Sequence, residues 1–187
     1  IPAPPPVAER DSGLVIPATD RVGAAMFRRG GVTYVVIDAA VSFAPPADPM
    51  FSDFSAHLLP DATVLRIVPK DGRGIALTRA PDGWRIEAVE HPAPFHPIEM
   101  TTDGNRIAFA VPEPGQTVSI PDPDNGAPLL IGTQRAPGYG IAGERRTVDF
   151  VLPATALGIM VEALSDRVTL RATPTGFVLS TPGADAR

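Results

Sequence analysis

Prolines recur along most of this chain and rule out long helices. Among its 187 residues are 23 prolines and 17 glycines. Each proline removes a backbone hydrogen-bond donor and obstructs the helical turn before it. Hydrophobic residues make up 44% of the chain, which is enough to build a folded core. We therefore expect short strands joined by many turns.

Several β-rich runs are separated by turn residues. The first two, 22–27 and 32–38, flank a pair of glycines that tolerates the positive φ angles of a hairpin turn. Similar runs, punctuated by Pro, Asp, Asn and Gly, follow at 64–68, 75–79, 84–89, 106–111, 118–120, 129–131, 147–152, 168–171 and 177–179. The pattern predicts antiparallel hairpins and meanders. Alternation within the runs 75–79 and 84–89 directs one face of each toward a core.

Two segments carry helical signals. Asp48 and Pro49 form an N-cap followed by proline at the first helical position, and residues 51–58 then repeat apolar side chains at helical spacing. They predict one short helix of about ten residues at most. The apolar segment 154–164 fits a helix or a strand, because periodicity does not separate the two over so short a run.

The chain aligns with itself at an offset of 93 residues. Segment 59–86 then falls on 152–179 with six identities in 28 positions, and the Pro81-x-Gly83 turn falls on Pro174-x-Gly176. Apolar alternation stays in step as well, which favours two related β units over the alternative of chance similarity.

The predicted fold is all-β, with two related antiparallel β units of sandwich or meander type and one short helix. We expect a proline-rich tether at 1–18, a first β unit at 19–100, a second at 101–180 and a linker at 181–187. The chain opens on Ile-Pro-Ala-Pro-Pro-Pro without Met, so we also expect that a leader or an upstream region has been removed.

Charge and cysteine content exclude several classes of function. A net charge of -5 provides no basic footprint for a nucleic acid, and no apolar run reaches the length of a membrane span. The absence of cysteine excludes disulfides, thiol catalysis and Cys-ligated zinc. It fits an exported protein without deciding the compartment.

The motifs of catalysis and cofactor binding are weak or missing. Gly138–Gly143 has the letters of a dinucleotide-binding loop, but a β-rich run follows where that motif needs a helix. Asp122–Gly126 opens like a calcium loop without its later ligands, so a turn explains it. No Gly-x-Ser-x-Gly elbow occurs. We expect no cofactor, no resident metal and no enzyme activity. The alternative is a metal-dependent hydrolase built on His91, His96 and Glu99.

Five residues are candidates for binding. Arg28-Arg29 and Arg145-Arg146 are two basic pairs that could face one anionic partner. Trp84 follows the Gly83 turn and is the aromatic residue best placed for exposure, where it could stack on a sugar. A carbohydrate-binding module is therefore a further alternative.

The runs 21–27 and 32–38, the latter ending in Val-Ile-Asp, resemble the opening of AMIN-type β modules of bacterial envelope proteins. The same stretch, with 62–86 and 150–179, is similar to β-rich regions that precede helical repeats in large alphaproteobacterial tetratricopeptide-repeat proteins. This resemblance implies a periplasmic, non-catalytic module that binds peptidoglycan or an envelope protein. The chain is about twice the size of one AMIN module, and no site residue carries over. Oligomeric state is not predicted.

Overall fold

The computed structural model describes residues 13–43 and 51–182, and its regular secondary structure is almost entirely antiparallel β-strand. The all-β prediction is confirmed. In the described ranges the helical structure is a single turn, η1 (Lys70–Gly72).

The strands form two sandwiches in chain order. The first contains β1 (Leu14–Pro17), β2 (Ala24–Arg29), β3 (Val32–Ile37), β4 (Phe51–Leu58), β5 (Thr63–Pro69), β6 (Gly74–Ala80) and β7 (Gly83–Val89). The second contains β9 (Glu99–Asp103), β10 (Arg106–Ala110), β11 (Pro114–Pro121), β12 (Pro128–Gln134), β14 (Arg145–Arg146), β15 (Phe150–Leu152), β16 (Ile159–Ala163), β17 (Thr169–Thr173) and β18 (Gly176–Ser180). The short strand β8 (His96–Pro97) lies in the connector between them and pairs in parallel with β13 (Tyr139–Gly140).

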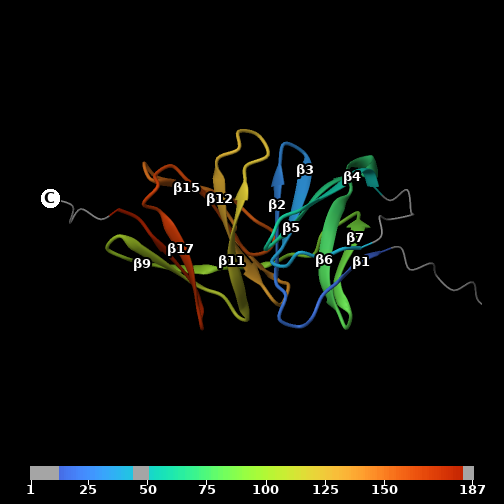
Figure 1. Ribbon diagram of the computed structural model, residues 1–187, viewed down its shortest axis with the longest axis horizontal. Helices are drawn as coiled ribbons and strands as arrows, with labels where there is room; N and C mark the ends of the chain where they lie inside the picture. Colours follow the sequence, from blue (N-terminus) through green and yellow to red (C-terminus); the bar gives the residue numbers. More distant parts are fainter. Residues whose placement is uncertain (1–12, 44–50, 183–187) are drawn as a thin grey trace, which may run out of the picture.

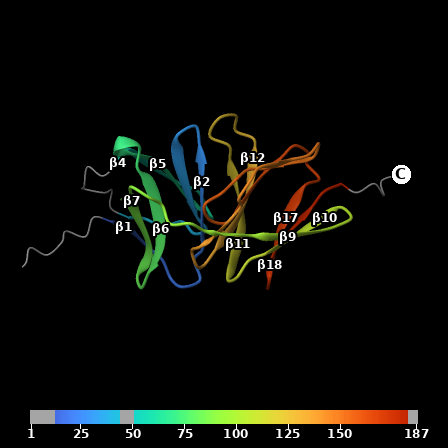
Figure 2. The same cartoon turned by 180° about the vertical axis from the view of Figure 1, so that it is seen from behind.

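Four β layers follow one another along the long axis of the molecule (Figure 1). Strands β1, β7 and β6 form one outer layer, and β2, β3, β5 and β4 form the layer beneath it. The next layer holds β11, β12, β16, β15 and β14, and the other outer layer holds β9, β10, β18 and β17. The same succession is visible from behind (Figure 2). The two central layers belong to one nine-stranded sheet, in which β12 adjoins β2.

The seven strands of the first sandwich have counterparts in the same order in the second, which adds β9 and β14, and the outer layers also share their register. Strands β1, β6 and β7 correspond to β10, β17 and β18, and each paired residue of the second sandwich lies 93 positions after its counterpart. The corresponding pairs are Leu14–Ile86, Ile16–Trp84 and Leu77–Ile86, and Ile107–Leu179, Phe109–Phe177 and Leu170–Leu179. The offset at which the sequence aligns with itself is thus also the offset at which these registers coincide.

Two glycines at corresponding positions allow the outer strands to approach closely. A Cβ atom at Gly83 would lie 1.9 Å from the carbonyl oxygen of Ile16, and one at Gly176 would lie 1.7 Å from that of Phe109. Both distances are far below van der Waals contact, so only glycine fits either position.

Three hydrophobic clusters hold the layers together. One fills the first sandwich and contains Trp84, and a second fills the second sandwich and contains Phe177. The third lies between the two central layers, where the outward faces of the sandwiches meet. Its buried members are Ala25, Phe27, Tyr34, Val36, Ala62, Val118, Ile120, Leu129, Ile131 and Met160.

The predicted helix near residue 50 is wrong, because residues 51–58 form strand β4. Strand β4 pairs with β5, and its register shifts between Phe51 and Asp53. The bulge adds one residue and brings Phe51 and Phe54, three positions apart, to the same core, where their rings stack 5.7 Å apart. In a bulged strand, two inward side chains can thus be three residues apart, as they are in a helix. Asp48 and Pro49 lie outside the described residues.

Other boundaries also differ from the prediction. Residues 14–17 of the predicted tether form β1, whose alternating apolar residues pair with β7. The segment 154–164 contains β16 and no helix. The predicted boundary at residue 100 falls within β9.

Replacing Trp84 tests the core of the first sandwich. Trp84 is fully buried, so Trp84→Ala is expected to lower the free energy of unfolding by about 3–5 kcal/mol. Trp84→Phe is the matched control, since phenylalanine is the residue at the corresponding position of the second sandwich. Its loss should be much smaller. Urea unfolding followed by circular dichroism measures both, and equal stability of the alanine variant and the wild type would contradict this packing.

Candidate functional site

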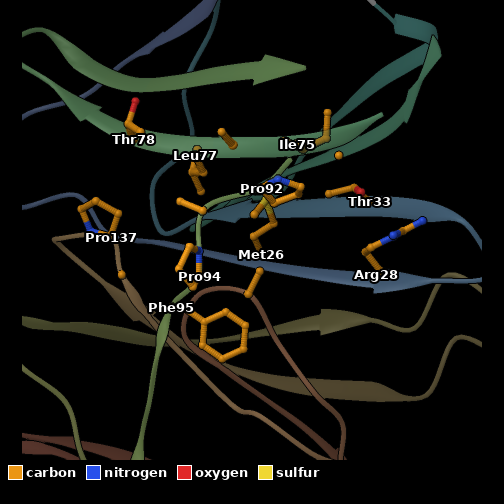
Figure 3. Close-up of a pocket in the computed structure, with 15 residues that line it drawn as sticks. Met26, Arg28, Thr33, Ile75, Leu77, Thr78, Pro92, Pro94, Phe95 and Pro137 are labelled. Atoms are coloured by element: carbon orange, nitrogen blue, oxygen red, sulfur yellow. The ribbon is translucent and has the colours of Figure 1, made fainter. Parts of the chain in front are cut away.

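The first sandwich contains a cavity of about 710 Å³ between β6 and β2. Its lining is mostly apolar, and its volume is in the range of ligand pockets. The lining residues are Met26, Arg28, Thr33, Gly74, Ile75, Ala76, Leu77, Thr78, Pro92, Ala93, Pro94, Phe95, Pro137, Gly138 and Ala156. Figure 3 shows β6 on one side of the cavity, β2 on the other and the proline-rich connector passing between them.

Strand β6 presents a free edge to this cavity. It ends its layer, and within the described part of the chain it pairs only with β7. Five consecutive β6 residues, 74–78, line the cavity, so the backbone of the strand is exposed to it as well as its side chains. An unpaired strand edge offers N–H and C=O groups that a further strand could satisfy.

The corresponding place in the second sandwich is closed. There β17 lies directly against β11, the counterparts of β6 and β2. Strand β2 is instead joined to a segment of the second sandwich. Met26 donates a hydrogen bond to the carbonyl of Leu157 at 2.9 Å, and Ala156 donates to the carbonyl of Met26 at 2.9 Å. These bonds occupy the outer edge of β2, so β2 does not close onto β6.

The connector between the sandwiches forms the remaining wall together with Pro137, Gly138 and Ala156 of the second sandwich. Pro92 packs so closely on Gly74 that a Cβ atom there would lie 2.3 Å from the proline Cγ. Farther along, His96 and Ile98 donate backbone hydrogen bonds to the carbonyls of Gly138 and Gly140, at 2.7 and 2.8 Å. The wall is therefore fixed at both ends.

Arg28 is the one charged residue of this lining. Its side chain is exposed, and no described acidic residue forms an ion pair with it. The cavity thus combines a long apolar surface with a cation at its border.

Arg29, the other member of the first basic pair, forms ion pairs within the protein. Its guanidinium contacts the carboxylates of Asp122 and Glu162 in the second sandwich, and its Nε lies 3.6 Å from Asp124. Burial alone would favour a neutral Asp122, but the hydrogen bond and charge of Arg29, together with backbone hydrogen bonds from Asp124 and Asn125, outweigh it and lower the pKa of Asp122. Arg29 is therefore a structural residue.

The second basic pair lies elsewhere, on β14. Arg145 and Arg146 are exposed, and Arg146 lies 3.3 Å from Glu144. Unlike Arg28, neither residue lines a cavity described here, and the prediction that both pairs bind one anionic partner remains untested.

Trp84 is not an exposed platform, and that prediction is wrong. Its exposed fraction is 0%, and its indole Nε1–H donates to the carbonyl of Val22 at 2.9 Å. Alternation along β7 places Trp84 on the same inward face as Ile86. The first residue after the turn is thus already part of the core.

A second cavity, of about 700 Å³, contains two members of the alternative metal set. His96 and Glu99 line it together with Glu113 and Tyr139, and the His96 ring lies 5.4 Å from that of Tyr139. His91 is not part of the lining. Among residues 13–43 and 51–182 no three His, Asp or Glu side chains form a metal-binding group, so the three predicted ligands are not assembled.

The two loops that resemble cofactor motifs have structural roles. Asp122–Gly126 is a turn, in which Gly126 donates to the carbonyl of Asp122 at 2.8 Å. The glycine loop contains β13, which pairs with β8, and it leads into strand β14. The β-rich run predicted after this loop contains β14, and β15 begins at its last residue.

Sequence reasoning missed the cavity between β6 and β2. Met26, Ile75 and Leu77 are ordinary apolar strand residues, and no pattern distinguishes them from core positions. The available signal was the dense run of prolines at 92–97, of which residues 92–95 belong to no strand.

No protein-family model matches the chain, and no curated protein or solved structure matches it. In the described residues no helix is long and apolar enough to cross a membrane.

Asp38 is a buried carboxylate between the two sandwiches. It accepts hydrogen bonds from Gly23 N at 2.9 Å and from the Thr133 hydroxyl at 2.6 Å. Burial raises the pKa of Asp38, and these bonds offset only part of that effect. The folded state therefore binds this proton more tightly than the unfolded chain does.

The raised pKa predicts a pH dependence with a definite sign. As pH falls through the folded pKa of Asp38, this residue should add stability, and the gain is complete below its unfolded value of about 3.9. The difference in unfolding free energy between wild type and Asp38→Asn should thus shift in favour of the wild type as pH is lowered from 7 to about 4. Urea unfolding at a series of pH values measures it, and a shift of opposite sign would contradict the assignment.

Proposed function

We propose that this chain is a non-enzymatic interaction module of the bacterial envelope, exported to the periplasm, whose first sandwich binds an extended apolar segment of a protein partner. The observation that carries the proposal is the open cavity beside the free edge of β6. The corresponding place in the second sandwich is closed, because β17 lies against β11 there. The cavity is therefore specific to the first sandwich.

An extended peptide satisfies both parts of this surface. Its backbone can pair with β6, as in other cases of strand addition, and alternate side chains then enter the apolar space. Strand β6 has seven residues, so a paired segment would be of similar length. Ile75, Leu77 and Met26 supply apolar contacts, and Arg28 favours an acidic group at the border of the segment.

The chemistry of the lining favours a protein over peptidoglycan as partner. Glycan strands present mainly hydroxyl and amide groups, which would lose water against this apolar wall without replacement hydrogen bonds. The buried position of Trp84 also removes the sugar-stacking platform on which the carbohydrate-binding alternative depended. The resemblance of residues 21–27 and 32–38 to AMIN-type modules supports the envelope location.

A tryptophan at the cavity border tests the proposal. Peptides are selected from a displayed random library on the full chain, and their affinity is then measured by fluorescence anisotropy. Ala93 lines the cavity and is exposed, so Ala93→Trp should obstruct the site without disturbing a core and weaken the selected peptides by about tenfold or more.

Ala172→Trp is the matched control. Ala172 is exposed on β17, the counterpart of β6, and does not line the cavity, so its replacement should leave the affinity unchanged. Selected peptides that are predominantly apolar and sensitive to Ala93→Trp alone would support the proposal. Equal binding by both variants, or binding of purified sacculi in place of any apolar peptide, would overturn it.

A further inference from the structure

The face that each sandwich turns toward the other is made of corresponding residues. With β2 matched to β11 at the 93-residue offset of the outer strands, the pairing registers match β3 to β12 at 95 and β5 to β16 at 96. The extra residues lie in the turn between β11 and β12 and in the segment that follows. The matched positions within the central cluster are Ala25 and Val118, Phe27 and Ile120, Tyr34 and Leu129, Val36 and Ile131, and Val64 and Met160.

Two polar contacts also join corresponding positions. Arg29, the last residue of β2, and Asp122, the residue directly after β11, lie 93 positions apart and form an ion pair. Asp38 and Thr133 lie 95 residues apart and are linked by the 2.6 Å hydrogen bond. In an assembly of two equivalent units related by a two-fold axis, a residue meets its own counterpart only near that axis.

We infer that the central face of each unit is a self-complementary surface made for a second unit of the same fold, and that Asp38, Thr133, Arg29 and Asp122 lie along its approximate two-fold axis and favour unlike over like units. Two copies of the first unit would place Arg29 against Arg29 and Asp38 against Asp38. Two copies of the second would place Asp122 against Asp122. Both arrangements bring like charges together, whereas the observed one pairs opposite charges.

The backbone around Asp38 and Thr133 follows the same relation. Gly23 N donates to Asp38 Oδ1 at 2.9 Å, and Gln116 N donates to Thr133 Oγ1 at 2.9 Å. Gly23, directly before β2, and Gln116, in β11, are themselves 93 residues apart. A carboxylate moved from position 38 to position 133 would therefore accept a hydrogen bond from Gln116 N, the equivalent donor. A threonine at position 38 would still face that carboxylate.

The exchange variant Asp38→Thr/Thr133→Asp of the full chain tests this inference. Asp38→Thr alone removes the shared acceptor, and Thr133→Asp alone sets two carboxylates together, so each should reduce the folding equilibrium constant about tenfold to a hundredfold. The double variant should recover to within about tenfold of wild type. Urea unfolding measures all four proteins. Losses that add in the double variant would overturn the axis assignment.

A second exchange tests the same axis assignment if variants of the buried Asp38–Thr133 pair do not fold. Arg29→Asp/Asp122→Arg is made in an Asp124→Asn/Glu162→Gln background, which removes the other two carboxylates beside Arg29. Recovery relative to both single replacements in that background supports the inference, and additive loss contradicts it. Neither experiment depends on the peptide ligand proposed above.

Discussion

The rest of the structure depends on the apolar contact between the two central layers. Strands β2 and β3 bury both faces. Met26 and Val35 point into the first sandwich, while Phe27, Tyr34 and Val36 pack against the second. Separated from its neighbour, either sandwich would expose this second face to water, at a cost that grows with its apolar area. The two units therefore stabilise each other, and the ion pair between Arg29 and Asp122 adds a polar contact between them.

The same contact explains why one sandwich is closed and the other open. Residues 156–157 of the second unit bond to the outer edge of β2, while the counterpart strand β11 carries no such addition among the described residues and rests against β17. The cavity between β2 and β6 arises from this asymmetry. One sandwich is thus closed around its own core, whereas the other leaves a cavity open between two of its strands.

Sequence patterns predicted the local structure well and the assembly poorly. Turn chemistry located the hairpin at Gly30-Gly31, and the apolar alternation of β6 and β7 identified Ile75, Leu77 and Ile86 as inward residues, whereas Trp84, predicted to be exposed, is buried. Apolar periodicity gave a wrong helix prediction at β4, because the bulge adds one residue and changes the spacing of the inward side chains along the strand. The role of Arg29 and the presence of the cavity depend on packing between units, which no local pattern encodes.

Amide hydrogen exchange tests the central claim most directly. In the full chain, with and without a selected apolar peptide, our account predicts that exchange slows in β6 at residues 74–80, where the strand edge gains a partner. Residues 169–173 of the counterpart β17 should be unaffected. Unchanged exchange in β6 with the peptide bound, or equal protection of β17, would contradict the account.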